Sequence, residues 1–328
     1  MSNFLAWAGG KSQVLKHLAP HIPRYMRNYY EPFLGGGSVL LYILDQASKG
    51  NTVIDGGVTC ADINKSLILT FDTIKNHTER VIQQYEDLCY VFENCDSEDM
   101  CKKHYAGCVC KECYYHAIRT DFNARCKRHL ATNATLDSTN MSRIHVMARV
   151  TIAAQFLFLN ATCYRGLYRE SKAGLMNSCF WTKRPLKMKS QPIREAGVLF
   201  RDFDVQFVAC SYKCFFEQHI ASPANKTDFV LIDPPYIPQS HGDNISAVYH
   251  KDGFGEDDTE TVIEWINDHA QTLSITYCNH ASEEIIAMCI DHWPVIKTYD
   301  VRRCLKYSGV ADIAAELLIT NVVTENIN

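Results

Sequence analysis

Phe229-Val230-Leu231-Ile232-Asp233-Pro234-Pro235-Tyr236 is the stretch around which the sequence is organised. Its first four residues form an apolar run, which predicts a buried strand. The two prolines then fix the backbone and remove two N–H donors, so a carboxylate, carbonyl oxygens and a flat ring stand at the strand's carboxyl end. Such a group can grip a planar amine, with Asp233 and the Pro234 carbonyl accepting its hydrogens and Tyr236 stacking on its ring. The alternative is a simple tight turn, because Asp and Pro are frequent in turns.

The composition is that of a globular protein with one large domain or two domains. A chain of 328 residues can bury a sizeable core, and 47% hydrophobic and 21% charged residues are ordinary values. No apolar run approaches the length of a membrane span, and the N-terminus lacks the basic and apolar regions of a signal peptide. We therefore expect no membrane partner and a reducing intracellular compartment, cytoplasm or nucleus, in which the 15 cysteines are thiols.

Positive charge is concentrated in one part of an otherwise acidic chain. The segment Arg119–Arg194 holds 14 Lys and Arg but only 3 Asp and Glu, whereas the whole chain has a net charge of −4. Neutralisation of phosphates by Lys and Arg supplies most sequence-independent affinity for nucleic acid. The segment therefore predicts a nucleic-acid face, with a solvated basic surface as the alternative.

Two motifs near the N-terminus suggest a cofactor site. Gly9-Gly10-Lys11-Ser12 is not a phosphate-binding loop, because the pattern requires glycine where Leu5 stands and no strand precedes it. Tyr29–Phe33 is predicted as a strand, Gly35-Gly36-Gly37 as a tight turn, and Ser38 as the start of a helix. A strand, a glycine turn and a helix begin a nucleotide-binding α/β unit, although the glycine spacing does not favour a dinucleotide.

The next predicted strand lies within Val58–Asn64 and ends in an acidic residue, Asp62. In nucleotide-binding folds, an acid at this place holds ribose hydroxyls. The alternative role of Asp62 is to cap the following helix, which is predicted from Asn64 to about Ile82.

The middle of the chain contains a cysteine cluster and a second basic motif. Cys108, Cys110 and Cys113 suggest a zinc site, but a paired cysteine motif is missing, so thiols in a loop are favoured and no metal is predicted. Helices are predicted over Tyr114–Lys127 and Val146–Leu159. After them, Asn160–Arg169 interleaves Arg and Tyr around a glycine, which suits contacts to bases and phosphates, with a surface loop as the alternative. The basic strip continues with Lys183 and Arg184.

Strands and helices alternate again after the basic segment. Strands are predicted at Val205–Ala209, Phe229–Ile232 and Leu273–Tyr277, with a last pair at the C-terminus, and helices at Lys213–Ile220 and Thr259–Gln271. This order predicts a doubly wound α/β sheet with a second domain inserted. The histidines His250 and His280 are given no proton-transfer role.

The motifs and their order resemble the Dam family of N6-adenine DNA methyltransferases, the group with an Asp-Pro-Pro-Tyr motif. The resemblance covers most of the chain in patches, and the patches together are highly specific. It is carried by Phe4–Lys11, Glu31–Ser38, Ala61–Asn64, Phe158–Arg169, Asp233–Tyr236, Ala247–His250, Asn279–His280, Val301–Arg303 and Glu316–Leu318.

The resemblance implies a Rossmann-like class I methyltransferase sheet, residues 1–65 and 195–328, with a mainly helical target-recognition domain, residues 66–194, inserted. It implies S-adenosylmethionine as cofactor and double-stranded DNA as partner. Asp233, Pro234, Pro235 and Tyr236 would hold a flipped adenine. The implied cofactor residues are Trp7, Lys11, Phe33, Gly35, Gly37, Asp62 and Asp233, and the implied DNA residues are Tyr164, Arg165, Leu167 and Arg169. The basic strip adds Lys183 and Arg184 as expected DNA contacts.

Two positions depart from the family pattern. Arg165 stands where the family often has Asn, and Ser211-Tyr212 stands where many members have Asp-Phe near the cofactor's adenine. Methylation of RNA or of a protein amide, and a catalytically inactive DNA-binding relative, are the alternative functions. We expect a monomer, or a weak dimer on DNA, and by resemblance a short palindromic target of the GATC kind.

Overall fold

The computed structural model describes residues 3–7, 14–95, 110–130, 143–171, 173–181, 186–236, 254–289, 293, 295–303 and 312–322. These residues fall into two compact units. Residues 3–7 and the described residues between 62 and 209 form one, here called the helical unit. The remaining described residues form the other, here called the sheet unit.

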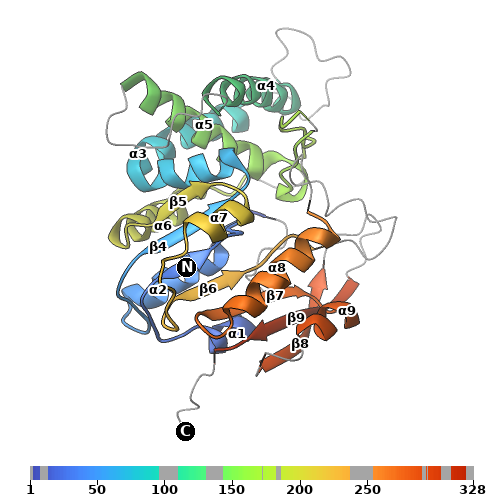
Figure 1. Cartoon of the computed structure of the whole chain (residues 1–328). Helices are drawn as coiled ribbons and strands as arrows, with labels where there is room; N and C mark the ends of the chain where they lie inside the picture. Colours follow the sequence, from blue (N-terminus) through green and yellow to red (C-terminus); the bar gives the residue numbers. More distant parts are fainter. Residues whose placement is uncertain are drawn as a thin grey trace. The chain divides into compact units, whose positions relative to one another are not determined.

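The sheet unit is built on strands that lie in the order β4-β2-β6-β7-β9-β8 (Figure 1). β2 pairs in parallel with β4 and with β6, and β6 pairs in parallel with β7. β9 is antiparallel to both of its neighbours, β7 and β8. The bounds are β2 Tyr29–Glu31, β4 Val58–Asp62, β6 Phe229–Ile232, β7 Ser274–His280, β8 Val295–Arg303 and β9 Asp312–Thr320. The predicted α/β class with a mostly parallel sheet is confirmed, and so is the last strand pair.

β6 is the centre of this sheet, as its apolar sequence predicts. All four of its side chains are fully buried. A strand that is covered on both faces needs such a continuous apolar run, because neither face meets water. Polar side chains can therefore act only beyond the carboxyl end of β6, where the chain leaves the sheet.

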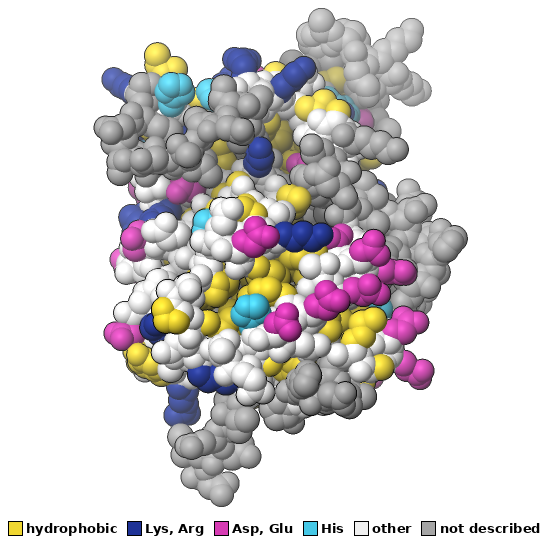
Figure 2. All heavy atoms as spheres, in the orientation of Figure 1, with side chains coloured by type: hydrophobic (Ala, Val, Ile, Leu, Met, Phe, Trp, Pro, Cys, Tyr) yellow, Lys and Arg dark blue, Asp and Glu magenta, His cyan; other side chains and the backbone are white. Residues whose placement is uncertain are grey.

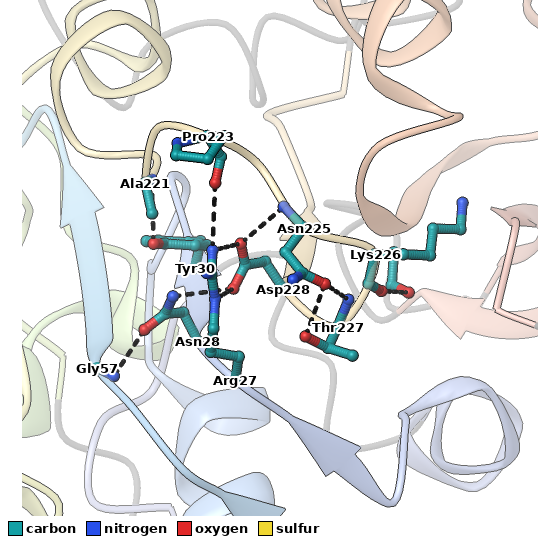
Figure 3. A network of polar contacts seen from close by, with 11 residues as sticks. Arg27, Asn28, Tyr30, Gly57, Ala221, Pro223, Asn225, Lys226, Thr227 and Asp228 are labelled. Atoms are coloured by element: carbon teal, nitrogen blue, oxygen red, sulfur yellow. Dashed lines mark hydrogen bonds and ion pairs between the residues drawn. The ribbon is translucent and has the colours of Figure 1, made fainter.

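A polar network fixes the amino end of β6 beside β2 (Figure 3). The carboxylate of Asp228 is fully buried and accepts from Arg27 Nε at 2.8 Å and from Asn28 Nδ2 at 2.8 Å. It also accepts from Arg27 Nη2 at 2.5 Å and from the backbone N–H of Asn225 at 3.1 Å. Because a buried carboxylate is costly unless it is paired and hydrogen-bonded, these donors hold the two strands in register.

The strand order creates a switch point between β2 and β6. The chain passes from β2 to β4 on one side and later returns to β6 on the other side of β2. In open α/β sheets, ligands bind at the carboxyl ends of the strands where the order reverses. The glycine turn after β2 and the Asp-Pro-Pro-Tyr segment after β6 both lie at that edge.

Short elements and helices complete the sheet unit. β1 pairs in parallel with β3, and α8 carries an acidic first turn. Figure 2 shows acidic side chains gathered over α8, where Glu256, Asp257, Glu260 and Glu264 are exposed. The bounds are α1 Leu15–Leu18, η2 Ala19–His21, β1 Tyr25–Met26, α2 Ser38–Ser48, β3 Val53–Ile54, α7 Tyr212–Gln218, α8 Glu256–His269 and α9 Glu283–Cys289.

The helical unit packs long helices around α5, whose side chains from Ala148 to Asn160 are mostly buried. By length and composition α5 resembles a membrane span, but 67% of its apolar window is buried in the structure, as in a core helix. A buried ion pair joins Arg149 on α5 to Asp72 on α3. The bounds are α3 Lys65–Glu93, α4 Lys111–Leu130, α5 Arg143–Thr162, η4 Tyr164–Gly166, α6 Ser190–Asp202 and β5 Gln206–Ala209.

Several elements differ from the prediction. α3 extends to Glu93, beyond the predicted end at Ile82, with a non-helical backbone at His77. α4 continues to Leu130, beyond the predicted end at Lys127, and α5 begins at Arg143, before the predicted start at Val146. Residues 131–142 lie outside the described residues. α6 was not predicted, and Asn279 and His280 belong to β7 instead of following it. The compact helical unit ends at Ala209. The predicted insert, residues 66–194, stays a prediction.

Candidate active site

Tyr236 is held in a defined position at the end of β6. Its hydroxyl donates to Glu316 Oε2 at 2.5 Å and lies 3.5 Å from Asp233 Oδ1. Burial, and then the charges of Asp233 and Glu316, raise the pKa of Tyr236 well above its ordinary value. The phenol therefore stays protonated at neutral pH and acts as a donor, which leaves the ring fixed at the strand end.

Glu316, which is distant from Tyr236 in sequence, accepts the hydrogen bond of the Tyr236 hydroxyl. It lies on β9, is almost fully buried, and is in register with His280 of β7 and Tyr299 of β8. The His280 ring centroid lies 6.1 Å from that of Tyr236. The resemblance to the Dam family includes Glu316 but implies no role for it, because nothing in the sequence shows that β9 pairs with β7.

The side chain of Asn279 fixes the ring of His280. Asn279 Nδ2 donates to the Tyr277 hydroxyl at 2.5 Å, which leaves its Oδ1 as an acceptor. That oxygen accepts from the His280 backbone N–H at 2.8 Å and lies 3.0 Å from His280 Nδ1. Because the Asn279 oxygen is an acceptor, a neutral His280 ring carries its proton on Nδ1 and donates it to this oxygen. His280 thus has a defined hydrogen-bond partner, its lack of a proton-transfer role stays a prediction, and His250 lies outside the described residues.

The glycine turn after β2 has the backbone that only glycine adopts readily. Gly35 and Gly37 have φ angles of 48° and 66°. The Gly37 backbone N–H donates to Leu34 O at 2.9 Å, and Ser38 then begins α2. Without a Cβ, such a turn lets a ligand approach the backbone closely. The predicted strand, turn and helix are therefore present, with β2 ending at Glu31 instead of Phe33.

Aromatic rings stand beside the glycine turn. The Phe33 ring stacks on Tyr212 with centroids 5.5 Å apart and meets Phe254 edge-on at 5.8 Å. Ser211 caps α7 by accepting from the Cys214 backbone N–H at 3.3 Å, so this hydroxyl supports the helix. The sequence predicted Phe33 as a cofactor residue, and the structure adds Tyr212 as its stacking partner.

Two predicted cofactor residues belong to the helical unit. Asp62 accepts from the Asn64 backbone N–H at 2.9 Å, and Asn64, instead of Asp62, caps α3. The capping alternative for Asp62 is thus wrong. Trp7 stacks on Tyr168, with centroids 5.7 Å apart, and on Phe156 at 6.2 Å. A third predicted residue, Lys11, lies outside the described residues.

The predicted DNA segment forms a tight turn at η4. Arg165 is exposed and has a left-handed backbone, with φ 56°, and its guanidinium lies 5.3 Å from the Tyr164 ring centroid. Tyr164 also meets Trp181 edge-on at 4.8 Å. Arg169 is half-buried, whereas Leu167 is buried and packs into the unit. Lys183 and Arg184 lie outside the described residues.

Asn160 anchors this turn, and its role was missed in the sequence. Its side chain is buried, accepts from the Ala6 backbone N–H at 3.1 Å, and donates to Ala6 O at 2.8 Å and to Gly166 O at 3.0 Å. One amide thereby joins the N-terminal segment, the end of α5 and the turn. An Asn that follows a long apolar helix is the only sequence signal for such a role.

The cysteines that suggested zinc are only partly described. Cys108 lies outside the described residues. Cys110 is buried, and its Sγ accepts from the Cys113 backbone N–H at 3.4 Å. These two therefore contribute to the start of α4, and a ligand role for them stays untested.

The chain is similar to a known enzyme family over most of its length. The family described as D12 class N6 adenine-specific DNA methyltransferase matches residues 7–293. Type II methyltransferase M.MjaIII of Methanocaldococcus jannaschii is 30% identical over 268 residues, which are 78% of this chain and 75% of that protein.

Two further relatives show a similar extent of match. Type II methyltransferase M1.LlaDCHI of Lactococcus lactis subsp. cremoris is 24% identical over 256 residues, covering 78% of this chain and 72% of that protein. The DNA adenine methylase of Escherichia coli strain K12 is 29% identical over 255 residues, which are 76% of this chain and 70% of that protein.

Proposed function

The chain belongs to the D12 class of N6 adenine-specific DNA methyltransferases, and we propose that it methylates an adenine flipped out of duplex DNA, with S-adenosylmethionine as the methyl donor. Transfer of a methyl group to adenine in DNA follows from the family. The flipping, the identity of the donor and the residue roles are the proposal. The observation that carries it is the Asp233–Tyr236 segment at the switch point, with the Tyr236 hydroxyl bonded to Glu316.

Asp233 and Pro234 would activate the adenine amine. Its nitrogen is a poor nucleophile, because the lone pair is delocalised into the ring. Hydrogen bonds to the Asp233 carboxylate and the Pro234 carbonyl draw the nitrogen towards tetrahedral geometry and localise that lone pair. Pro235 keeps the backbone rigid, and positioning of this kind can lower a barrier by roughly 7–11 kcal/mol in favourable systems.

Tyr236 would hold the flipped base. A base inside a duplex cannot reach the strand end, so it must leave the stack, at a cost of about a few kcal/mol. A base–aromatic stack is worth about 1–3 kcal/mol and offsets part of that cost. The hydrogen bond of the Tyr236 hydroxyl to Glu316 keeps the ring in place before the base arrives.

The glycine turn and the nearby aromatic rings fit a nucleoside-containing methyl donor. Gly35 and Gly37 let the backbone approach a ligand, Phe33 offers a ring face, and Asp62 supplies a carboxylate for ribose hydroxyls. Trp7 and Lys11 are further proposed contacts. When bound, S-adenosylmethionine supplies an activated methyl group on a sulfonium sulfur.

The helical unit would recognise the DNA. Arg165, Tyr164 and Arg169 form the described part of the proposed contact, with Arg169 reading a guanine edge and the others at phosphates or bases. Lys183 and Arg184 are proposed phosphate contacts, and Leu167 supports the turn from within. The acidic surface of α8 is unsuited to phosphates, so DNA is expected to avoid it.

Relatives named type II methyltransferases support a proposed restriction–modification role. A reducing intracellular compartment stays a proposal from the sequence. A short palindrome containing guanine is the proposed target. Sequencing of methylated sites on DNA exposed to the enzyme tests both ideas.

The proposed residue roles are tested with the variant Asp233→Ala. It is expected to abolish methyl transfer to duplex DNA while binding of S-adenosylmethionine changes little, because the cofactor keeps its other contacts. Labelled S-adenosylmethionine offered with duplex DNA, RNA or protein measures transfer, and calorimetry measures binding. Asp202→Ala, at an exposed aspartate at the end of α6, is the matched control. Wild-type turnover by Asp233→Ala overturns the proposed role, and product only on RNA or protein overturns the DNA substrate.

A further inference from the structure

Three metal-ligating side chains meet around α7. The Sγ atoms of Cys210 and Cys214 and a ring nitrogen of His219 all lie within 4.8 Å of one another, and all three residues are half-buried. In the part of the chain that the structure describes, this is the one group of three or more such side chains. It lies outside the Asp233–Tyr236 segment and outside the glycine turn.

The short helix explains why these residues converge. Ser211 caps α7, with Phe215 N donating to Ser211 O at 2.9 Å, which places Cys210 just before the first turn and Cys214 within it. His219 is the C-cap, and its backbone N–H donates to Phe215 O at 2.9 Å. Side chains on a helix lean towards its N-terminus. The His219 ring accordingly lies back over Phe215, with ring centroids 5.5 Å apart, in the direction of Cys214.

Contacts with α8 hold α7 in place. The Phe216 and Trp265 rings stack with centroids 3.9 Å apart and an interplanar angle of 7°. The Tyr212 hydroxyl donates to Asp258 Oδ1 at 2.8 Å. The ligand atoms are thus presented by an anchored helix. Zinc bonds of about 2.3 Å to sulfur and about 2.0–2.1 Å to nitrogen would bring ligand atoms to about 3.5–3.8 Å from one another. Side-chain rotation can supply that small contraction.

We propose that Cys210, Cys214 and His219 bind one Zn²⁺ ion, or a similar soft divalent cation, with water as the fourth ligand. Thiolate and imidazole are the ligand types that zinc prefers. Binding converts two thiols to thiolates and therefore releases two protons. The sequence predicted no metal and pointed to Cys108, Cys110 and Cys113 as the less favoured zinc cluster, so this proposal departs from both expectations.

The ion would fix the turn that carries Ser211 and Tyr212. Tyr212 stacks on Phe33, so the proposed site stabilises one side of the aromatic pair beside the glycine turn. The site does not depend on the proposed methyl donor or DNA substrate. Metal binding can therefore be measured on the full chain without any turnover.

The test is titration of the chelator-treated full-length chain with Co²⁺ and Zn²⁺. Co²⁺ should give a thiolate-to-cobalt absorption band with one equivalent bound, and one equivalent of Zn²⁺ should displace it. Cys214→Ser and His219→Gln remove ligands and should weaken binding by more than the roughly 10–100-fold typical of outer-shell changes. His219→Cys replaces one ligand by another and should retain the site.

Cys179→Ser, at an exposed cysteine outside the group, is the matched control and should behave as wild type. Circular dichroism of each apo variant establishes that it is folded. Binding that persists unchanged in both Cys214→Ser and His219→Gln belongs to other thiols and overturns the proposal. Absence of the cobalt band in the wild-type chain does the same.

Discussion

At the scale of single residues, Tyr236 has two separable roles. Its ring is proposed to face a base, whereas its hydroxyl bonds to the buried Glu316. Burial and two neighbouring carboxylates raise its pKa, so the hydroxyl remains a donor throughout the neutral range. A change that removes only the hydroxyl should therefore affect folding more than chemistry.

Tyr236→Phe is expected to lower the free energy of unfolding by about 1–3 kcal/mol, because the buried Glu316 carboxylate loses this donor. Methyl transfer should fall less than tenfold, since the ring remains. Tyr236→Ala also removes the stack and should cost about tenfold or more in kcat/KM. Urea unfolding and steady-state kinetics measure the two effects. Equal stability of Tyr236→Phe and the wild type would contradict the assigned hydrogen bond.

His21 supplies a pH-dependent contribution to stability. Both ring nitrogens are buried without a hydrogen-bond partner among the described residues. Burial, and then the charge of Lys297, lower its pKa below the ordinary 6.5. As pH falls through 6.5, the unfolded chain takes up a proton that the folded chain does not, so this stability is present above 6.5 and is lost towards acid pH.

His21→Leu should reduce the loss of stability between pH 7 and pH 5, measured by urea unfolding at both values. It should also be at least as stable as wild type at pH 7, because no unsatisfied nitrogen remains. Burial also lowers the pKa of His77, so part of the loss of stability between pH 7 and pH 5 should persist in this variant. An unchanged slope in His21→Leu would show that the ring is not protected from protonation.

At the scale of elements, the η4 turn depends on a close approach of two backbone segments. Gly166 has φ 69°, and a Cβ built on it would lie 2.3 Å from the Cβ of Ala6. Gly174 has nearly the same φ, 70°, but a Cβ there would meet nothing within 4 Å. Alanine variants at the two glycines therefore distinguish the cost of a left-handed backbone from the cost of a steric clash.

Gly174→Ala should cost about 1–2 kcal/mol of stability from the left-handed backbone alone. Gly166→Ala should cost about 1–3 kcal/mol more, because the N-terminal segment must move away. It should also weaken DNA binding, since the turn carries Arg165. Unfolding free energies and binding to a short duplex give the comparison. Equal losses of stability in the two variants would mean that the segment containing Ala6 moves away at little cost in free energy.

At the scale of the whole molecule, charge divides into a basic segment and an acidic surface on α8. Arg165 is the exposed basic residue on the proposed DNA turn, and its φ of 56° is a conformation that Asn tolerates better. The family often has Asn at this position. Arg165→Asn should therefore relieve strain and remove one positive charge together.

Arg165→Asn is expected to make the dependence of log Kd on log salt shallower by about 0.9 if the guanidinium contacts one phosphate. Stability should stay equal or rise. Arg80→Ala, at an exposed arginine of α3 outside the basic segment, should leave the slope unchanged. Fluorescence anisotropy at several salt concentrations provides the measurement. A slope unchanged by Arg165→Asn would exclude the phosphate contact.

Much of the sheet unit could be predicted from sequence, because apolar runs and glycine turns are local signals. β6, the Gly35–Gly37 turn and the start of α2 are present as expected. Features that depend on distant chain segments could not be predicted. The bonds of Glu316 to Tyr236 and of Asn160 to Ala6 require knowing which strands and segments become neighbours. α6 was not predicted because its polar first turn obscures the apolar helical periodicity of the sequence.

The hydrogen bond between Tyr236 and Glu316 also links the final position of the Tyr236 ring to the order of synthesis. Glu316 follows Tyr236 by 80 residues. At about 5–20 residues per second, a ribosome needs roughly 4–16 s to travel from one to the other. During that interval the proposed base-holding ring lacks its anchor, and β7 lacks its antiparallel neighbour. The Tyr236 ring is thus expected to reach its anchored position only after β9 has emerged from the ribosome and joined the sheet.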